Sequence, residues 1–235
     1  MCARGSDRVY APGPSTSPLG RATLRSSNAL TQLVVACFLT FVSRVSRADD
    51  AQHPSLSPGQ DFSNSLFILL SPNSEGWVGV GRTSDSISFG RVGRSRNDTD
   101  VAAVTVFSTP PGLNPQEFLA HVKEGLERDA PAPRFEVKTA SIRLSTARTY
   151  VCVEYNAMSI DHGKQLRFLP HKDLPIRLIA LYCQYPDKPG LAFSVSFSHR
   201  GEEPPPTFDA EAQDFIASVA VTSSSARPNK RLERP

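Results

Sequence analysis

The strongest constraint on the fold of this chain is a series of short apolar runs, rich in β-branched and aromatic residues, that turn residues separate. Four such runs precede a helical pattern, four more follow it in two pairs, and a second helical pattern closes the series. Strands that follow one another through short turns pair antiparallel. The sequence therefore predicts an α+β fold, an antiparallel β-sheet flanked by two main helices. The expected strands are 65–70, 76–80, 86–89, 101–107, 135–144, 148–155, 176–185 and 191–197.

Two segments carry the apolar repeat of amphipathic helices. The first is 114–128, where Asn114 and Glu117 have the spacing of a capping box. The second is 208–219, with Thr207 as the expected N-cap. In the last strand, large apolar residues alternate with Ala and Ser, which indicates one packed face and one that is wet or contacts small side chains.

The two ends of the chain do not have the composition of a folded domain. They also hold the positive charge, because residues 1–48 carry +5 and residues 223–235 carry +3, whereas the remainder has 16 basic and 21 acidic residues, a net −5. Binding to nucleic acid needs a basic surface, so this balance argues against nucleic acid as a partner. We expect a leader at 1–48, a linker at 49–61, one domain at 62–222 and a disordered tail at 223–235.

An apolar run at 29–42 has the plan of a secretory signal peptide. Arginines precede it, and Ser46 and Ala48 offer small side chains for cleavage before Asp49. The run would span about 21 Å as a helix, less than the ~30 Å of a bilayer core. The pattern predicts a periplasmic or secreted protein with no transmembrane span in its mature form.

Two alternatives to this cleavage remain open. The apolar run is also compatible with a buried core helix. In addition, Cys37 follows Val-Val-Ala, as the acylated residue of a lipoprotein does, which would give a lipid-anchored protein. Against lipidation, apolar residues continue after Cys37 where lipoproteins have small or polar ones.

Removal of the leader leaves two cysteines, Cys152 and Cys183, each within an expected strand. Neighbouring antiparallel strands can bring Cα atoms to the ~5.5 Å that a disulfide needs. In an oxidising compartment this pair predicts a disulfide bond, with two separate buried thiols as the alternative. Zinc is disfavoured, because neither cysteine has a second Cys or His at ligand spacing.

The sequence has no motif that assigns a catalytic residue or a cofactor. The glycine-rich run at 76–83 fits neither a dinucleotide fingerprint nor a Walker loop and is typical of a strand and turn. Arg91, Arg94 and Arg96 lie beside acidic residues, which favours a solvated turn over an anion site. We therefore expect no cofactor, and catalysis is the less favoured class.

The polar segment 159–175 is the longest non-periodic stretch of the domain, and long loops in compact domains tend to carry function. Its cations and single phenylalanine, on an acidic domain, indicate an acidic protein or a glycan of the envelope as partner. This favours a non-catalytic envelope accessory or binding module. The candidate partner-binding residues are His162, Lys164, Arg167, Phe168, His171 and Lys172.

The alternative is a small periplasmic metal-binding protein or enzyme. It would use His162, His171 and His199 with nearby acids such as Asp161, provided that these side chains meet in one place. Two histidines and a carboxylate on a polar loop are more often solvated side chains than metal ligands. Spatial convergence of the three histidines separates this alternative from a binding module.

Several features fall in an order that is found in one group of exported proteins. Pro72 ends an early strand, Trp77 follows, and the helix 116–128 precedes Tyr182–Pro186 (YCQYP), Phe197–Arg200 (FSHR) and a terminal helix. In this order the chain resembles the PsbP-like and DcrB-like exported α-β-α sandwich domains over about residues 66–221. The resemblance implies a periplasmic or lipid-anchored bacterial accessory protein, and it carries over no catalytic residue.

Overall fold

The computed structural model describes residues 55–93, 98–130, 132–163 and 173–222. The expected leader, including Cys37, and the expected tail lie outside these residues. In the described part of the chain, neither helix is long and apolar enough to cross a membrane. In chain order the elements are β1 (Asp61–Ser63), β2 (Phe67–Leu70), β3 (Val78–Arg82), β4 (Ser86–Val92), β5 (Thr99–Ser108), α2 (Pro115–Asp129), β6 (Phe135–Ser145), β7 (Cys152–Asp161), β8 (Leu174–Gln184), β9 (Leu191–Arg200), α3 (Phe208–Ser218) and β10 (Ala220–Val221).

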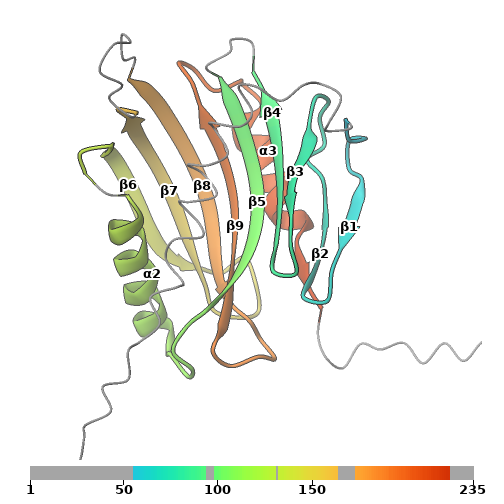
Figure 1. Cartoon of the computed structure of the whole chain (residues 1–235). Helices are drawn as coiled ribbons and strands as arrows, with labels where there is room; N and C mark the ends of the chain where they lie inside the picture. Colours follow the sequence, from blue (N-terminus) through green and yellow to red (C-terminus); the bar gives the residue numbers. More distant parts are fainter. Residues whose placement is uncertain (1–54, 94–97, 131, 164–172, 223–235) are drawn as a thin grey trace, which may run out of the picture.

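Seven strands form one antiparallel sheet in the order β3-β4-β5-β9-β8-β7-β6 (Figure 1). β5 and β9 are paired at its centre from Thr99–Arg200 to Ser108–Leu191. The chain inserts α2 and the meander β6–β7–β8 between these two partners, so β3 and β6 become the edges. The expected α+β fold with an antiparallel sheet is thus confirmed.

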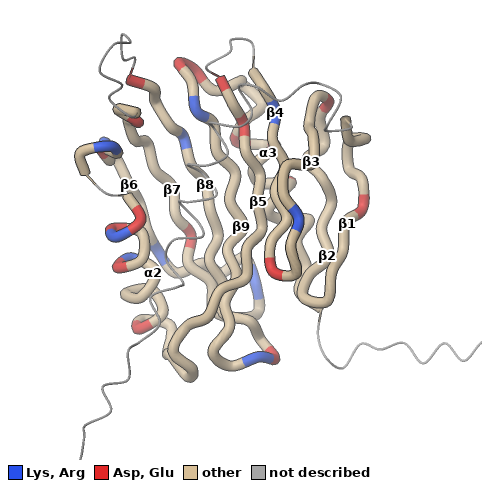
Figure 2. The backbone as a smooth tube through the Cα atoms, in the orientation of Figure 1, with Lys and Arg blue, Asp and Glu red and all other residues tan. Residues whose placement is uncertain are grey.

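The two helices lie on opposite faces of this sheet (Figure 1). α3 and the small sheet β1-β2-β10 cover the face where the aromatic side chains Phe89, Phe197 and Phe215 pack together. α2 covers the other face over β6 and β7, where Phe118 and Val122 contact the strands. Figure 2 shows that charged residues lie mainly at strand ends, in turns and on α2, while the middle of β5 and β9 has none.

The ends of the helices differ in how far the sequence predicted them. The capping box of α2 is present: the Asn114 side chain accepts hydrogen bonds from the amides of Gln116 and Glu117, and Glu117 accepts one from the Asn114 amide. At α3 Thr207 occupies the N-cap position as expected, but its side chain does not cap the helix. Thr207 has helical dihedral angles, and its hydroxyl donates to Glu211 instead.

The strand boundaries shorten the expected recognition loop. β7 continues to Asp161 and β8 begins at Leu174, so only 162–173 connects them. Residues 55–60, which the sequence placed in a linker, contact the domain: the Leu56 amide donates to the Trp77 carbonyl at 2.9 Å. β1 and β10 are two- or three-residue strands that the sequence pattern did not indicate.

The last strand of the large sheet is buried on both faces. Phe193, Val195 and Phe197 pack under α3 as expected. On the opposite face Ser194 and Ser198 are also buried, at 3% and 1% exposed. The alternation of β9 therefore marks large against small side chains in a central strand, rather than a packed against a wet face.

The expected disulfide is present. Cys152 of β7 lies directly opposite Cys183 of β8 in the antiparallel register, and the two form a disulfide bond. Both residues are fully buried on the α3 side of the sheet. The bond therefore joins two neighbouring strands within the core.

Candidate functional site

The structure describes only one of the six residues predicted to bind a partner. His162 follows the end of β7, and its ring lies 3.3 Å from Glu136 and 3.0 Å from Asp173. The hydrogen bond to Asp173, helped by Glu136, raises the pKa of His162, so the two carboxylates favour its charged form. The other five, Lys164, Arg167, Phe168, His171 and Lys172, lie outside the described residues.

Asp161, just before His162, is held by two arginines. Its carboxylate accepts from Arg134 at 3.1 Å and from Arg200 at 3.0 Å. Burial opposes its ionisation, but the hydrogen bonds from Arg134 and the Gly163 amide and the nearby charges outweigh burial and lower the pKa of Asp161. The carboxylate thus ties together the ends of β6, β7 and β9.

His199 lies in a separate cluster under α3. Its Nδ1 is 2.8 Å from Asp100, and its ring packs edge-on against Phe208. In the described chain His199 contacts Asp100 and Phe208, whereas His162 contacts Glu136 and Asp173, and His171 lies outside the described residues. Within the described ranges no three His, Cys, Asp or Glu side chains are grouped to hold a metal.

Arg91 is the centre of this buried cluster rather than part of the solvated turn that the sequence favoured. Its guanidinium contacts Asp100 at 2.8 Å, Glu211 of α3 at 3.2 Å and the Ser74 hydroxyl at 2.7 Å, and it stacks on Trp77. The cluster joins β4, β5, β9 and α3. Nε2 of His199 is buried, and no partner in the described chain reaches it.

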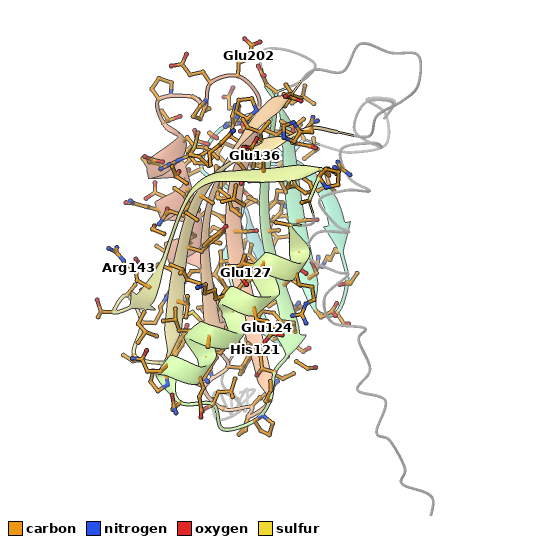
Figure 3. The ribbon with its side chains drawn as sticks, turned by 90° about the vertical axis from the view of Figure 1, so that its left-hand side faces the viewer. His121, Glu124, Glu127, Glu136, Arg143 and Glu202 are labelled. Carbon is orange, nitrogen blue, oxygen red and sulfur yellow. A yellow bond between two sulfur atoms is a disulfide. The ribbon has the colours of Figure 1, made fainter. Side chains whose placement is uncertain are left out.

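A groove of about 470 Å³ lies between α3 and the outer half of the large sheet. α3 packs over β8 and β9, and the groove lies beside it, lined by residues of α3, β6, β7 and β8. β6 and β7 each turn a charged side chain toward this side, Arg143 and Glu154, and the segment that joins them supplies Arg148. Figure 3 shows Arg143 projecting from β6, at the opposite end of that strand from Glu136.

The groove has an apolar floor and a polar rim. Ile179 and Leu181 of β8 and Ile216 of α3 provide the apolar side chains. Asn156 of β7 and Gln213 of α3 add amide groups. A groove of this size with a few convergent polar groups is typical of a binding site for a small ligand or a short peptide.

Three arginines and two acids line the groove, a net charge of +1. Arg143 pairs with Glu154 at 2.7 Å, and Arg177 pairs with Asp209 at 3.2 Å. The hydrogen bond from Ser145, helped by Arg143, lowers the pKa of Glu154 despite its partial burial. Ser145 and Arg143 thus favour the ionised form of Glu154 and fix the position of its carboxylate.

Arg148 has a different role. Its Nη2 donates to the Ile216 carbonyl at 2.8 Å and to the Ala217 carbonyl at 3.4 Å, at the C-terminal end of α3. A cation there satisfies carbonyls that lack a helical partner and complements the helix dipole. Among the described residues, no carboxylate pairs with Arg148.

Sequence reasoning did not single out this groove. The available signal was the alternation in the run 148–155, which places Glu154 on the face opposite Val153 and Tyr155. Glu154 lies on the same strand face as Cys152, so a charged side chain at this position indicates that the core ends near it. The sequence offered no sign of where α3 would pack on the sheet.

Comparisons with known proteins give fold-level likeness only. No known protein family and no curated protein matches the sequence. A protein of Bacteroides thetaiotaomicron VPI-5482 aligns at 14% identity with a TM-score of 0.41, over 71% of this chain and 49% of its own length. The chain thus spans about half the length of that protein.

Two further solved structures are similar at the same level. LpqN, described as involved in cell envelope biogenesis of Mycobacterium tuberculosis, aligns at 12% identity with a TM-score of 0.43, over 73% of this chain and 91% of LpqN. A mutant of the protein Mog1 aligns at 7% identity with a TM-score of 0.38, over 74% of this chain and 98% of Mog1. These likenesses are weak and concern the fold alone, and they show no family for this chain.

Proposed function

We propose that the mature chain is a non-catalytic binding module of the bacterial envelope, and that it holds its ligand in the groove between α3 and β6–β8. The observation that carries the proposal is the groove itself, in which an apolar floor is surrounded by guanidinium and amide groups. Such a surface contributes apolar burial for affinity and hydrogen bonds for orientation.

Two further features support this proposal. The carboxylates of the groove, Glu154 and Asp209, are each held in an ion pair with an arginine, which fixes the position of the charged groups around the apolar floor. The disulfide in the core suits an oxidising compartment, as the predicted signal peptide requires.

The test is an NMR titration of the exported, purified protein with a library of small amphipathic compounds and short peptides. Binding in the groove should shift the methyl signals of Ile179, Leu181 and Ile216. Ala217→Trp places a large side chain at the rim of the groove and should abolish these shifts. Ala210→Trp, an exposed alanine of the same helix that does not line the groove, is the matched control and should leave them unchanged.

Two results would contradict the proposal. One is that every compound that binds shifts only the NMR signals of residues outside the groove. The other is binding in the groove that Ala217→Trp does not weaken, because the site would then lie outside the volume that the tryptophan fills.

A further inference from the structure

The groove has more unused hydrogen-bond donors than unused acceptors. Each guanidinium has five N–H donors and no acceptor. Within the described chain, Arg148 uses only Nη2, toward two carbonyls, and Arg177 uses only Nη2, toward Asp209. Nε and Nη1 of both arginines therefore have donors to spare.

Three of the four carboxylate oxygens of the groove are occupied. One oxygen of Glu154 accepts from the Ser145 hydroxyl and the other from Arg143. One oxygen of Asp209 accepts from Arg177. The half-buried amide of Asn156 has no hydrogen bond to another described residue and offers the groove one NH2 donor group and one carbonyl acceptor. The spare guanidinium donors therefore favour a ligand that supplies acceptors.

Arg177 and Arg148 mark opposite ends of the groove. Arg177 faces Asp209 in the first turn of α3, and Arg148 faces Ile216 and Ala217 in the last. The seven residue-to-residue steps of helix from 209 to 216 rise about 10 Å. An extended peptide covers about the same distance with three residues.

The charge differs between these ends. Arg177 has its charge balanced by Asp209, whereas Arg148 contacts only neutral carbonyls in the described chain. An anionic group is therefore best placed at Arg148, because an unbalanced guanidinium binds a carboxylate with a charge-assisted, bidentate geometry. Neutral main-chain carbonyls suit Arg177 and Asn156.

The geometry points to a peptide carboxyl terminus as the ligand of the groove: a free carboxylate on Arg148, main-chain carbonyls on Asn156 and Arg177, and apolar side chains on Ile179 and Leu181. This inference rests on the proposed function and specifies its ligand. A simple alkyl carboxylate fits less well, because it has one acceptor group and would leave the donors at the other end without a partner.

The experiment measures affinities of N-acetyl tripeptides that end in Leu, Phe, Val or Ala, each as the free acid and as the C-terminal amide, with octanoate as the alkyl comparison. At least one free acid should bind about tenfold or more tightly than its amide, the difference expected for one charge-assisted hydrogen-bond pair. Arg148→Gln should remove this preference, while Lys123→Gln, the same charge change on the opposite helix α2, should keep it.

Arg148 also contacts the end of α3, so the fold of the variant needs a check by its amide spectrum. The acid-to-amide ratio in the unaltered protein does not depend on that variant. Equal affinity of acid and amide, or tighter binding of octanoate than of every peptide, would overturn the ligand assignment. If no peptide binds but other library compounds occupy the groove, the ligand class is wrong and the proposed binding function stands.

Discussion

Asp129 is a half-buried carboxylate in an unfavourable position, and its replacement gives the sharpest prediction about stability. Burial raises the pKa of Asp129 from 3.8 to about 6, against a smaller opposing effect of the Arg128 charge. Asp129 is also the last residue of α2, where the helix dipole disfavours a negative charge. The folded protein therefore binds a proton at Asp129 more tightly than the unfolded chain does.

The sign of the effect follows from this difference. A carboxyl group whose pKa is raised on folding contributes stability while it is protonated and loses that contribution as the pH rises through the folded value. At pH 7.5 Asp129 is ionised in both states, so the folded state bears the full cost of the buried charge. Asp129→Asn removes the charge and should stabilise the protein at that pH.

The magnitude follows from the size of the pKa change. A change of one pKa unit corresponds to about 1.4 kcal/mol, so a rise from 3.8 to about 6 gives at most about 3 kcal/mol. Because the group is only half buried, solvent screening reduces this value, and we expect about 1–2 kcal/mol. At pH 4.5 the gain should fall to roughly one third, since Asp129 is then protonated in the folded state.

The assay is urea unfolding of the wild type and of Asp129→Asn at pH 7.5 and pH 4.5. Asp187→Asn, in the exposed turn between β8 and β9, is the matched control and should change stability by less than about 0.5 kcal/mol at either pH. A stabilisation of the same size at both pH values would refute the reasoning, because it would not come from the charge. Destabilisation at pH 7.5 would mean that the carboxylate makes a favourable contact.

Four further outcomes are expected. Thiol titration of denatured, non-reduced protein should find no free thiol at Cys152 or Cys183, and two titratable thiols would contradict the disulfide. Reduction should lower the free energy of unfolding by about 3–4 kcal/mol, the chain-entropy value for a loop of this length. Arg91→Met should lower the free energy of unfolding in urea by about 3–5 kcal/mol, because it leaves the Asp100 carboxylate buried without the Arg91 charge. A decrease below about 1 kcal/mol would show that the cluster relaxes. Replacing residues 163–172 with a short Gly/Asn turn should leave the unfolding transition nearly unchanged and weaken capture of an acidic envelope partner if the loop is a second contact surface, and undiminished capture would leave the groove as the binding site. Mass spectrometry of exported protein should find Asp49 at the N-terminus, against an acylated Cys37 or an intact leader.

Local patterns in the sequence determined the elements whose physics is local. The capping box at Asn114 and Glu117 needs only residues three apart, and it formed as predicted. The alternation of apolar residues predicted the long strands and, through them, the antiparallel α+β fold. The disulfide was predicted because both cysteines lie in strands of one meander, where β7 and β8 are neighbours both in sequence and in space.

Tertiary structure decided whatever depends on distant contacts. The sequence could not show that Arg91 is buried, because its partners Asp100 and Glu211 come from another strand and from a helix 120 residues later. Nor could it show that Ser194 and Ser198 are buried, because a small polar residue in a strand gives no sign of what covers it. The groove has the same origin. It lies beside α3 and is lined by residues of β6, β7 and β8, and the length of a helix does not fix where it packs on a sheet.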